Sequence, residues 1–243
     1  MDIREKLKLD REGLIEHGPI TIVALGDSVT HGAFGPGEID GECVYHRLLA
    51  QRIAKIRSYV PINVINAGIG ATNAKMAVAR LDSQVFLHNP DLVTVCFGLN
   101  DVNDKLEDFT GALRTIFGEC NKRGIECIFL TPNMLNTHVA DDTPPDHVNY
   151  ATVTAKKQSE GIMDACMDAA RAVAREMGVK IADAYAEWKK LSETEDTTKL
   201  LANRINHPVR KMHELFCDVL MKTIFEGEAE MGQKNSSTMY DGK

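Results

Sequence analysis

The stretch "ITIVALGDS" (residues 20–28) places a small hydroxyl directly after a run of apolar residues. A run of Ile, Val and Leu without polar alternation is typical of a strand covered on both faces, as in a parallel sheet. The glycine and aspartate that follow predict a sharp bend into a helix. At this bend Asp27 or Ser28 could simply cap the helix, or Ser28 could be a nucleophile.

The same strand pattern recurs four times, at residues 62–66, 91–98, 126–131 and 179–185. Helical patterns occupy residues 42–58, 73–87, 105–123, 147–177 and 208–226. This alternation predicts an α/β fold, a three-layer α/β/α sandwich around a doubly wound, five-stranded parallel sheet. We expect a single domain over residues 1–226.

The two ends of the chain have their own patterns. Residues 1–16 predict an N-terminal surface helix with Ile3, Leu7 and Leu14 on one side. We expect this helix to pack on the sheet, and a contact within a homo-oligomer is the weaker alternative. Residues 227–243 lack periodicity, which predicts a disordered tail.

The bulk composition is that of an ordinary soluble protein, with 44% hydrophobic and 26% charged residues in 243. A net charge of −7 argues against nucleic acid or an anionic membrane surface as the main partner. No apolar stretch approaches the length of a membrane span, and the first residues do not resemble a secretory signal. We therefore expect a cytoplasmic protein.

The chain has six cysteines but no CxxC pair. Together with the lack of a signal sequence, this predicts free thiols and no structural zinc site or other metal site. The cysteines are Cys43, Cys96, Cys120, Cys127, Cys166 and Cys217.

Four polar stretches stand where a ligand site is expected, because ligands of open α/β sheets bind beyond the carboxyl ends of strands. Three of them follow predicted strands directly, and the fourth lies late in the chain. They are "GDS" (26–28), "NAGIGATN" (66–73), "GLND" (98–101) and "NRINHPVRKMH" (203–213). Residues 133–150 form the longest polar, proline-containing connection and are expected to flank the site.

Each stretch has a chemical interpretation and a structural one. A serine nucleophile needs a base, and His207 stands on a loop edge because Pro208 begins a helical pattern. Asn100 can donate its amide N–H to an oxyanion, or can form a turn or cap together with Asp101. The glycine stretch also matches part of a dinucleotide fingerprint, but it lacks the third glycine.

These four blocks in this order resemble the SGNH hydrolase superfamily, the GDSL-type esterases, lipases and acylhydrolases. The resemblance implies a flavodoxin-like SGNH fold in which Ser28 is the nucleophile and His207 the general base. It implies three oxyanion donors, the N–H of Ser28, the N–H of Gly70 and the side chain of Asn100. "NAGIGAT" is one residue shorter than the common family block, which favours Gly70 and leaves Gly68 as the alternative. Asp27 and Asp101 are expected to be structural residues near the site.

One position departs from the family pattern. Family members usually carry an aspartate three residues before the catalytic histidine, and this chain has Arg204 there, preceded by Asn203. An arginine cannot accept the imidazole N–H. The orienting group could be Asn203, a backbone carbonyl, or an acid from elsewhere, or the site could be a dyad. The candidate acids are Asp183, Asp196 and Glu195.

The sequence therefore predicts a serine esterase that hydrolyses carboxylic esters without metal or organic cofactor. The substrates that the resemblance favours are O-acetyl groups on small or carbohydrate-derived molecules. The change at Arg204 motivates a rival, a catalytically silent binding protein with the same fold. A nucleotide-binding protein is the poorer rival, because the strand at 91–97 ends in "FGLND" instead of in an acidic residue.

Overall fold

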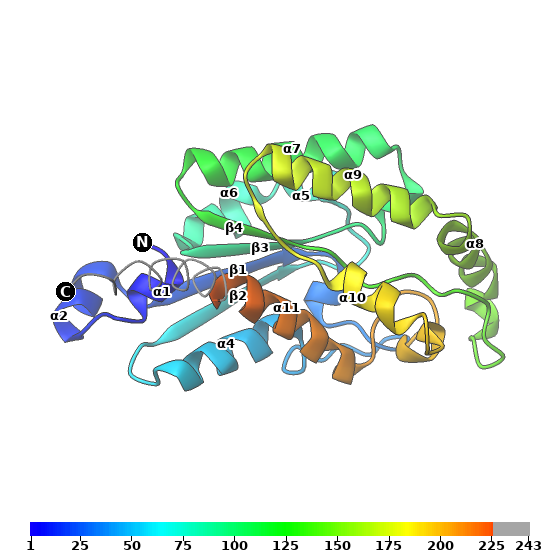
Figure 1. Ribbon diagram of the computed structural model, residues 1–243, viewed down its shortest axis with the longest axis horizontal. Helices are drawn as coiled ribbons and strands as arrows, with labels where there is room; N and C mark the ends of the chain where they lie inside the picture. Colours follow the sequence, from blue (N-terminus) through cyan, green and yellow to red (C-terminus); the bar gives the residue numbers. More distant parts are fainter. Residues whose placement is uncertain (226–243) are drawn as a thin grey trace, which may run out of the picture.

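The computed structural model describes residues 1–225, which contain a five-stranded parallel sheet with strand order β2-β1-β3-β4-β5 (Figure 1). All five strands lie where the apolar runs predicted them. Their bounds are Ile20–Gly26 for β1, Ile62–Gly68 for β2, Leu92–Cys96 for β3, Glu126–Leu130 for β4 and Lys180–Ala182 for β5.

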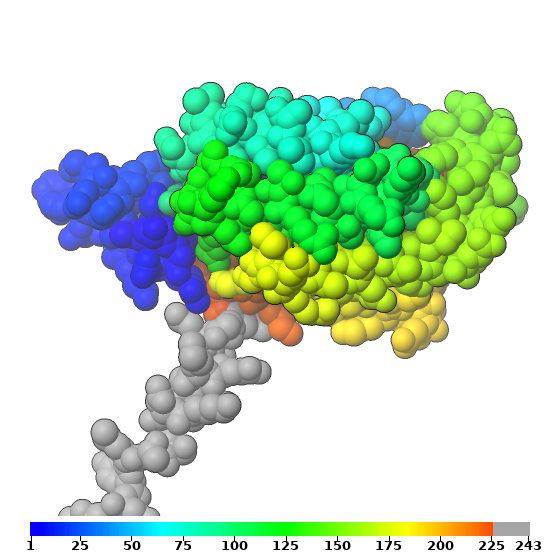
Figure 2. All heavy atoms as spheres, turned by 90° about the horizontal axis from the view of Figure 1, so that it is seen from above, coloured from blue at the N-terminus to red at the C-terminus, as the bar shows by residue number. Residues whose placement is uncertain are grey.

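Helices cover both faces of this sheet, which confirms the three-layer α/β/α architecture (Figure 1). One layer contains α5 (Ala74–Val78), α7 (Leu106–Lys122) and α9 (Ile162–Glu176), and Figure 2 shows these helices covering one side of the molecule. The other layer contains α4 (Tyr45–Ile56) and α11 (His213–Phe225). The hydrophobic core fills the space between these layers and the sheet.

The strand register explains why the first three polar blocks meet. β1 pairs with β2 from Ile20↔Ile62 to Gly26↔Gly68, and its other edge pairs with β3 up to Gly26↔Cys96. The three strands therefore end at the same level of the sheet. The loops that follow them carry "GDS", the glycine stretch and "GLND", so these loops lie side by side.

Two of the predicted helices are interrupted. The pattern over 73–87 forms α5, α6 (Leu81–Gln84) and the short 3₁₀ helix η1 (Phe86–His88), because Arg80 leaves helical geometry with φ −112° and ψ 5°. The Arg80 guanidinium donates to the carbonyl oxygens of Ala67 and Gly26 at the ends of β2 and β1. The pattern over 147–177 follows the short helix η3 (Pro145–His147) and forms α8 (Val148–Ser159) and α9, which are separated by Gly161 at φ +75°.

The last strand is shorter than the sequence predicted. β5 ends at Ala182, and Asp183 accepts a hydrogen bond from the N–H of Ala186 as the N-cap of α10 (Ala184–Leu191), a helix that the sequence pattern did not predict. The short helices η4 (Thr197–Leu200) and η5 (Arg210–Met212) follow, and η5 leads into α11.

The N-terminal segment contains two helices where one was expected over 1–16. These are α1 (Ile3–Lys6) and α2 (Arg11–His17), because Asp2 and Asp10 each cap a separate helix start. Ile3 and Leu7 are buried against the core, as expected of the apolar side of this segment. The expectation of a disordered tail at 227–243 falls outside the described residues.

Two further expectations concern the state of the cysteines and the length of apolar helices. All six cysteines are free thiols, as predicted. Within residues 1–225, no helix combines the length and the apolarity that crossing a bilayer requires.

Candidate active site

Ser28 is the first residue of α3 (Ser28–His31), at the bend after β1. Asp27 caps this short helix by accepting a hydrogen bond from the N–H of Val29 at 3.0 Å. Gly26 allows the bend, since a Cβ there would lie 2.0 Å from the Thr30 hydroxyl oxygen and 2.8 Å from a backbone oxygen of β3. Asp27 therefore supplies the cap, which leaves the Ser28 hydroxyl free of that role.

His207 lies on a tight loop before η5. Leu201 and Pro208 form an isolated antiparallel bridge across this loop, and the Ala202 N–H donates to the His207 carbonyl at 2.6 Å. The buried side chain of Asn203 fixes the interior of the loop, because its Oδ1 accepts hydrogen bonds from the N–H groups of residues 205, 206 and 207 at 2.9–3.0 Å. Asn203 therefore holds the backbone of this loop instead of the imidazole ring.

The two side chains from opposite ends of the sequence meet. His207 Nε2 lies 3.0 Å from Ser28 Oγ, and His207 Nδ1 lies 2.9 Å from the carbonyl oxygen of Phe34. A carbonyl only accepts hydrogen bonds, so Nδ1 carries the proton. This leaves Nε2 with a lone pair directed at the serine hydroxyl, the arrangement that a general base requires.

Phe34 thus supplies the acceptor that orients the imidazole, and this acceptor is a backbone carbonyl. Arg204 adopts φ +58° and pairs with Asp142 at 2.7 Å, so it does not orient the ring. Two of the candidate acids are engaged elsewhere, since Asp183 pairs with Arg171 and Asp196 caps η4. No sequence signal marked Phe34, because any residue has the carbonyl that it uses.

The surroundings of His207 favour its neutral form. Burial lowers the pKa of His207 below its ordinary value, the hydrogen bond to Phe34 opposes this, and nearby His147 lowers the pKa further. His147 belongs to residues 133–150, the segment expected to flank the site. This segment also contacts the histidine loop directly, since Asn133 donates to the Asn206 carbonyl at 2.9 Å.

The glycine stretch passes beside Ser28. A Cβ on Gly70 would lie 3.9 Å from the Ser28 Cβ and 3.8 Å from the ring of His31, so the backbone there is close to the serine and unhindered. Gly68 differs in two ways. Its N–H donates to Asn66 Oδ1 at 2.9 Å, and a Cβ on it would lie 2.3 Å from the backbone nitrogen of His31. Gly68 therefore serves close packing and its N–H is already engaged, whereas the backbone of Gly70 lies beside the serine.

Hydrogen bonds join the glycine stretch to "GLND". Asn100 Nδ2 donates to the Thr72 carbonyl at 2.8 Å, which leaves its second amide N–H. Asp101 accepts hydrogen bonds from the N–H groups of Ala74 and Gly98 at 2.8 and 2.9 Å. These contacts fix the two loops relative to each other, so the backbone at Gly70 and the side chain of Asn100 are held in place before any substrate binds.

Two carboxyl groups are buried under the site. Burial raises the pKa of Asp27 to about 7, with a contribution from the negative charge of Asp101. Burial raises the pKa of Asp101 to about 6. Neither side chain contacts the Ser28–His207 pair in the hydrogen bonds above, and both bond to backbone N–H groups, a placement that suits structural residues.

Residues 1–225 contain no group of three or more His, Cys, Asp or Glu side chains that could hold a metal ion. What the site does contain is a serine and a histidine in hydrogen-bond contact, with the backbone of Gly70 beside the serine. This arrangement is typical of acyl-transfer hydrolases.

The chain belongs to the GDSL-like Lipase/Acylhydrolase family, whose model matches residues 24–215. This match includes all four blocks, and it makes the protein a carboxylic ester hydrolase of the SGNH type. A search of curated protein sequences found no match.

Solved structures share the fold. The acetylxylan esterase Axe2 from Geobacillus stearothermophilus is 19% identical, with a TM-score of 0.66 over 85% of this chain and 94% of its own. LAE5, an alpha/beta hydrolase enzyme from the metagenome of Lake Arreo in Spain, is 20% identical, with a TM-score of 0.65 over 84% and 94%. Alanine variants of Axe2 at a serine, a histidine and an aspartate are described as catalytic mutants.

Proposed function

We propose that the protein is a serine esterase that hydrolyses O-acetyl esters of small or carbohydrate-derived alcohols through an acyl-enzyme on Ser28. The observation that carries the proposal is the 3.0 Å contact between Ser28 Oγ and His207 Nε2, together with the Nδ1 hydrogen bond that makes Nε2 an acceptor. Family membership supports ester hydrolysis in general, and these contacts support the assignment of the two residues.

The acylation step follows from this geometry. His207 Nε2 takes the hydroxyl proton while Ser28 Oγ forms a bond to the ester carbonyl carbon. The carbonyl oxygen becomes an oxyanion, which accepts hydrogen bonds from the N–H groups of Ser28 and Gly70 and from the Asn100 side chain. The bond from carbon to the alcohol oxygen then breaks, and the departing alcohol takes the proton from Nε2.

Deacylation repeats these steps with water as the nucleophile. His207 accepts a proton from the water as its oxygen attacks the acyl carbon. The bond to Ser28 Oγ then breaks, the serine regains the proton from Nε2, and the carboxylic acid leaves. Both half-reactions use the same base and the same oxyanion donors, so this chemistry requires no metal ion or organic cofactor.

The acetyl preference and the carbohydrate-derived alcohol are supported by the solved structures of the same fold, several of which are described as esterases of acetylxylan or acetyl-xylooligosaccharides. A panel of p-nitrophenyl esters with acetyl, butyryl and octanoyl groups tests the acyl preference. We expect kcat/KM to be highest for acetyl. A maximum at octanoyl would contradict this part of the proposal and leave the esterase assignment intact.

The decisive experiment compares the wild type with Ser28→Ala and His207→Ala on p-nitrophenyl acetate. We expect kcat to fall by at least about 10³-fold in each variant, because removing a member of the nucleophile–base pair removes most of the acceleration. A fluorophosphonate probe should label the wild type and leave Ser28→Ala unlabelled. Equal turnover by the wild type and Ser28→Ala would refute the assignment.

The rival is a silent binding protein, which the replacement of the usual aspartate by Arg204 favours. The Phe34 carbonyl argues against it, since it gives His207 the tautomer that a base needs. The labelling experiment separates the two, because a serine without an active base stays unlabelled.

A further inference from the structure

Phe34 belongs to a short hairpin, residues 33–40, that follows the serine helix. Ala33 and Ile39 form an antiparallel bridge, and the Phe34 N–H donates to the Glu38 carbonyl at 3.0 Å. At its base the Asp40 N–H donates to the Gly32 carbonyl at 2.8 Å. The hairpin thus has a defined shape of its own, and the Phe34 carbonyl is the group that it presents to His207.

Arg210 contacts this hairpin at three places. Its Nε donates to Asp40 Oδ2 at 3.1 Å and its terminal nitrogen donates to Glu38 Oε1 at 2.7 Å. Its guanidinium also lies over the Phe34 ring, 4.5 Å from the ring centroid. Arg210 stands three residues after His207, in η5, so one side chain ties the histidine segment to the hairpin.

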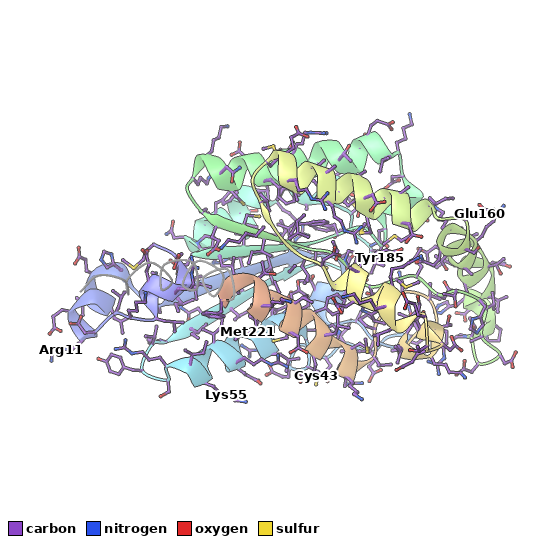
Figure 3. All side chains as sticks on the ribbon, in the orientation of Figure 1. Arg11, Cys43, Lys55, Glu160, Tyr185 and Met221 are labelled. Carbon is purple, nitrogen blue, oxygen red and sulfur yellow. The ribbon has the colours of Figure 1, made fainter. Side chains whose placement is uncertain are left out.

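The Phe34 ring is held from a second direction as well. It is fully buried and meets the ring of His213 edge-on, with centroids 5.3 Å apart. His213 begins α11, directly after η5. Cys43, labelled in Figure 3, lies two residues before Tyr45, whose N–H donates to His213 Nδ1 at 3.3 Å. Both residues that contact the Phe34 ring in this way, Arg210 and His213, follow His207 in the sequence.

We propose that Arg210 is a positioning residue for His207: it closes the 33–40 hairpin against the histidine segment and so keeps the Phe34 carbonyl in the place of the orienting carboxylate. This inference rests on the proposed function. Exposed ion pairs contribute little to stability, so the effect of this contact is expected in the geometry of the imidazole rather than in the fold.

The histidine needs this contact between Arg210 and the hairpin because its acceptor is the backbone carbonyl of a distant segment. An aspartate three residues before the histidine would be held by the same loop as the ring, whereas Phe34 lies 173 positions away in sequence. The hydrogen bond therefore depends on how closely two separate segments approach. Arg210 is suited to fix that approach, because its planar fork reaches two carboxylates while its face stacks on an aromatic ring.

The first test replaces Arg210 by Met and by Lys. We expect Arg210→Met to lower kcat on p-nitrophenyl acetate by about 10- to 100-fold, since a misplacement near 1 Å has effects of this size. KM should change by less than about 2-fold, because the Arg210 side chain is engaged with the hairpin rather than with the substrate. Arg210→Lys should recover part of the loss, because an ammonium can pair with one of the two carboxylates.

The matched control is Arg52→Met. Arg52 on α4 likewise pairs with two carboxylates of another element, Glu214 and Asp218 of α11, and neither carboxylate belongs to the 33–40 hairpin or to the histidine loop. We expect the kcat of this variant to equal that of the wild type.

A double substitution, Glu38→Gln with Asp40→Asn, removes the Arg210 ion pairs from the hairpin side. It should lower kcat as Arg210→Met does. The losses of kcat in Arg210→Met and in the double variant should not add in the triple variant, because both changes remove the same ion pairs between Arg210 and the hairpin.

A second readout follows the hydrogen bond itself. The Nδ1 proton of His207 should give a downfield proton resonance, assigned by its loss in His207→Ala. We expect this resonance to shift upfield and to exchange faster with water in Arg210→Met, and to stay unchanged in Arg52→Met. A structural role alone would lower the melting temperature without moving this resonance in the folded protein.

The outcomes separate the two proposals. If the wild type is active and Ser28→Ala is not, but Arg210→Met keeps the kcat and the resonance of the wild type, the positioning role is refuted and the esterase assignment stands. If Arg210→Met does not fold, the Glu38 and Asp40 double variant decides by the same two readouts. A wild type that neither hydrolyses esters nor reacts with the fluorophosphonate probe would overturn both proposals.

Discussion

His207 works with an uncharged acceptor, and its protonation should reflect this. Burial lowers the pKa of the imidazole, and the Phe34 carbonyl lacks the negative charge by which a carboxylate would raise it more strongly. In the proposed mechanism His207 must be neutral to accept the serine proton, so a lowered pKa keeps the enzyme active at lower pH. We predict that the acid limb of the kcat/KM profile has its midpoint below pH 6.5, the ordinary imidazole value. A midpoint above 6.5 would contradict this.

Position 204 gives a second prediction at this scale. Restoring the family aspartate by Arg204→Asp should not increase kcat, because Nδ1 already donates to Phe34 and the residue at 204 is directed toward Asp142. The substitution also places a second carboxylate opposite Asp142, so the protein should become slightly less stable. Steady-state kinetics and thermal unfolding check both parts, with Arg204→Asn as the uncharged control. An increase in kcat would show that the ring can turn to a new acceptor.

The single residues of the site differ in how far the sequence could predict them. Ser28, His207 and Asn100 have side chains with characteristic chemistry at characteristic spacings, and the structure places Ser28 and His207 in contact as expected. The resemblance favoured Gly70 and left Gly68 open, and the contacts of both glycines add the physical reason for that preference. The Phe34 carbonyl could not be predicted from the sequence, because every residue has a carbonyl and only the position of the hairpin brings this one to His207 Nδ1.

Among the elements, the histidine loop depends most on one side chain. Asn203 Oδ1 accepts three backbone N–H groups, so Asn203→Ala leaves them without their acceptor in a buried loop. We predict that this variant loses about 1–3 kcal/mol of unfolding free energy and that its kcat falls as well. Urea denaturation and turnover of p-nitrophenyl acetate measure the two effects. Asn203→Asp keeps an acceptor at Oδ1 and should retain more of both, and equal losses in the two variants would contradict this account.

The helices and strands also show where sequence patterns stop being informative. The strand cores were predicted because continuous Val and Ile runs are rare outside buried strands. The break of the 147–177 pattern at Gly161 and the start of α10 after Asp183 were missed. Both are decided locally, by a left-handed glycine and by an N-cap, while the apolar pattern continues through them.

For the whole molecule, the buried carboxyl of Asp27 links stability to pH. Its pKa is about 7 in the folded protein and 3.8 ordinarily, so between these values the folded state binds a proton that the unfolded state does not. Stability therefore falls as pH rises from about 4 to 7. Asparagine keeps an acceptor for the Val29 N–H and carries no charge. We predict that the unfolding free energy of Asp27→Asn, measured relative to that of the wild type, is higher at pH 8 than at pH 5. The difference should be a few kcal/mol, because one unit of pKa corresponds to about 1.4 kcal/mol.

Urea denaturation of both proteins at the two pH values measures this difference. Asp10→Asn removes a capping carboxylate at the exposed start of α2 and controls for the loss of a cap. If the advantage of Asp27→Asn over the wild type were the same at pH 5 and pH 8, the buried charge would not be its source.

The overall architecture was predictable because it follows from the alternation of strands and helices along the chain. The convergence of the site follows from the parallel register of β1, β2 and β3, which end together. The fourth block was harder to place, because its loop comes after the sheet is complete. The sequence could indicate its histidine, and only the packing of residues 133–150 and the 33–40 hairpin against that loop defines where the ring lies.

Ser28 and His207 are separated by 179 positions, and the carbonyl that orients the histidine also comes from the first part of the chain. During synthesis Ser28 and the Phe34 carbonyl therefore emerge long before His207. A nascent chain that ends before His207 already contains every strand of the sheet but has no His207 imidazole beside Ser28. Under the proposed mechanism, ester hydrolysis can begin only after the histidine loop has emerged and packed against the 33–40 hairpin.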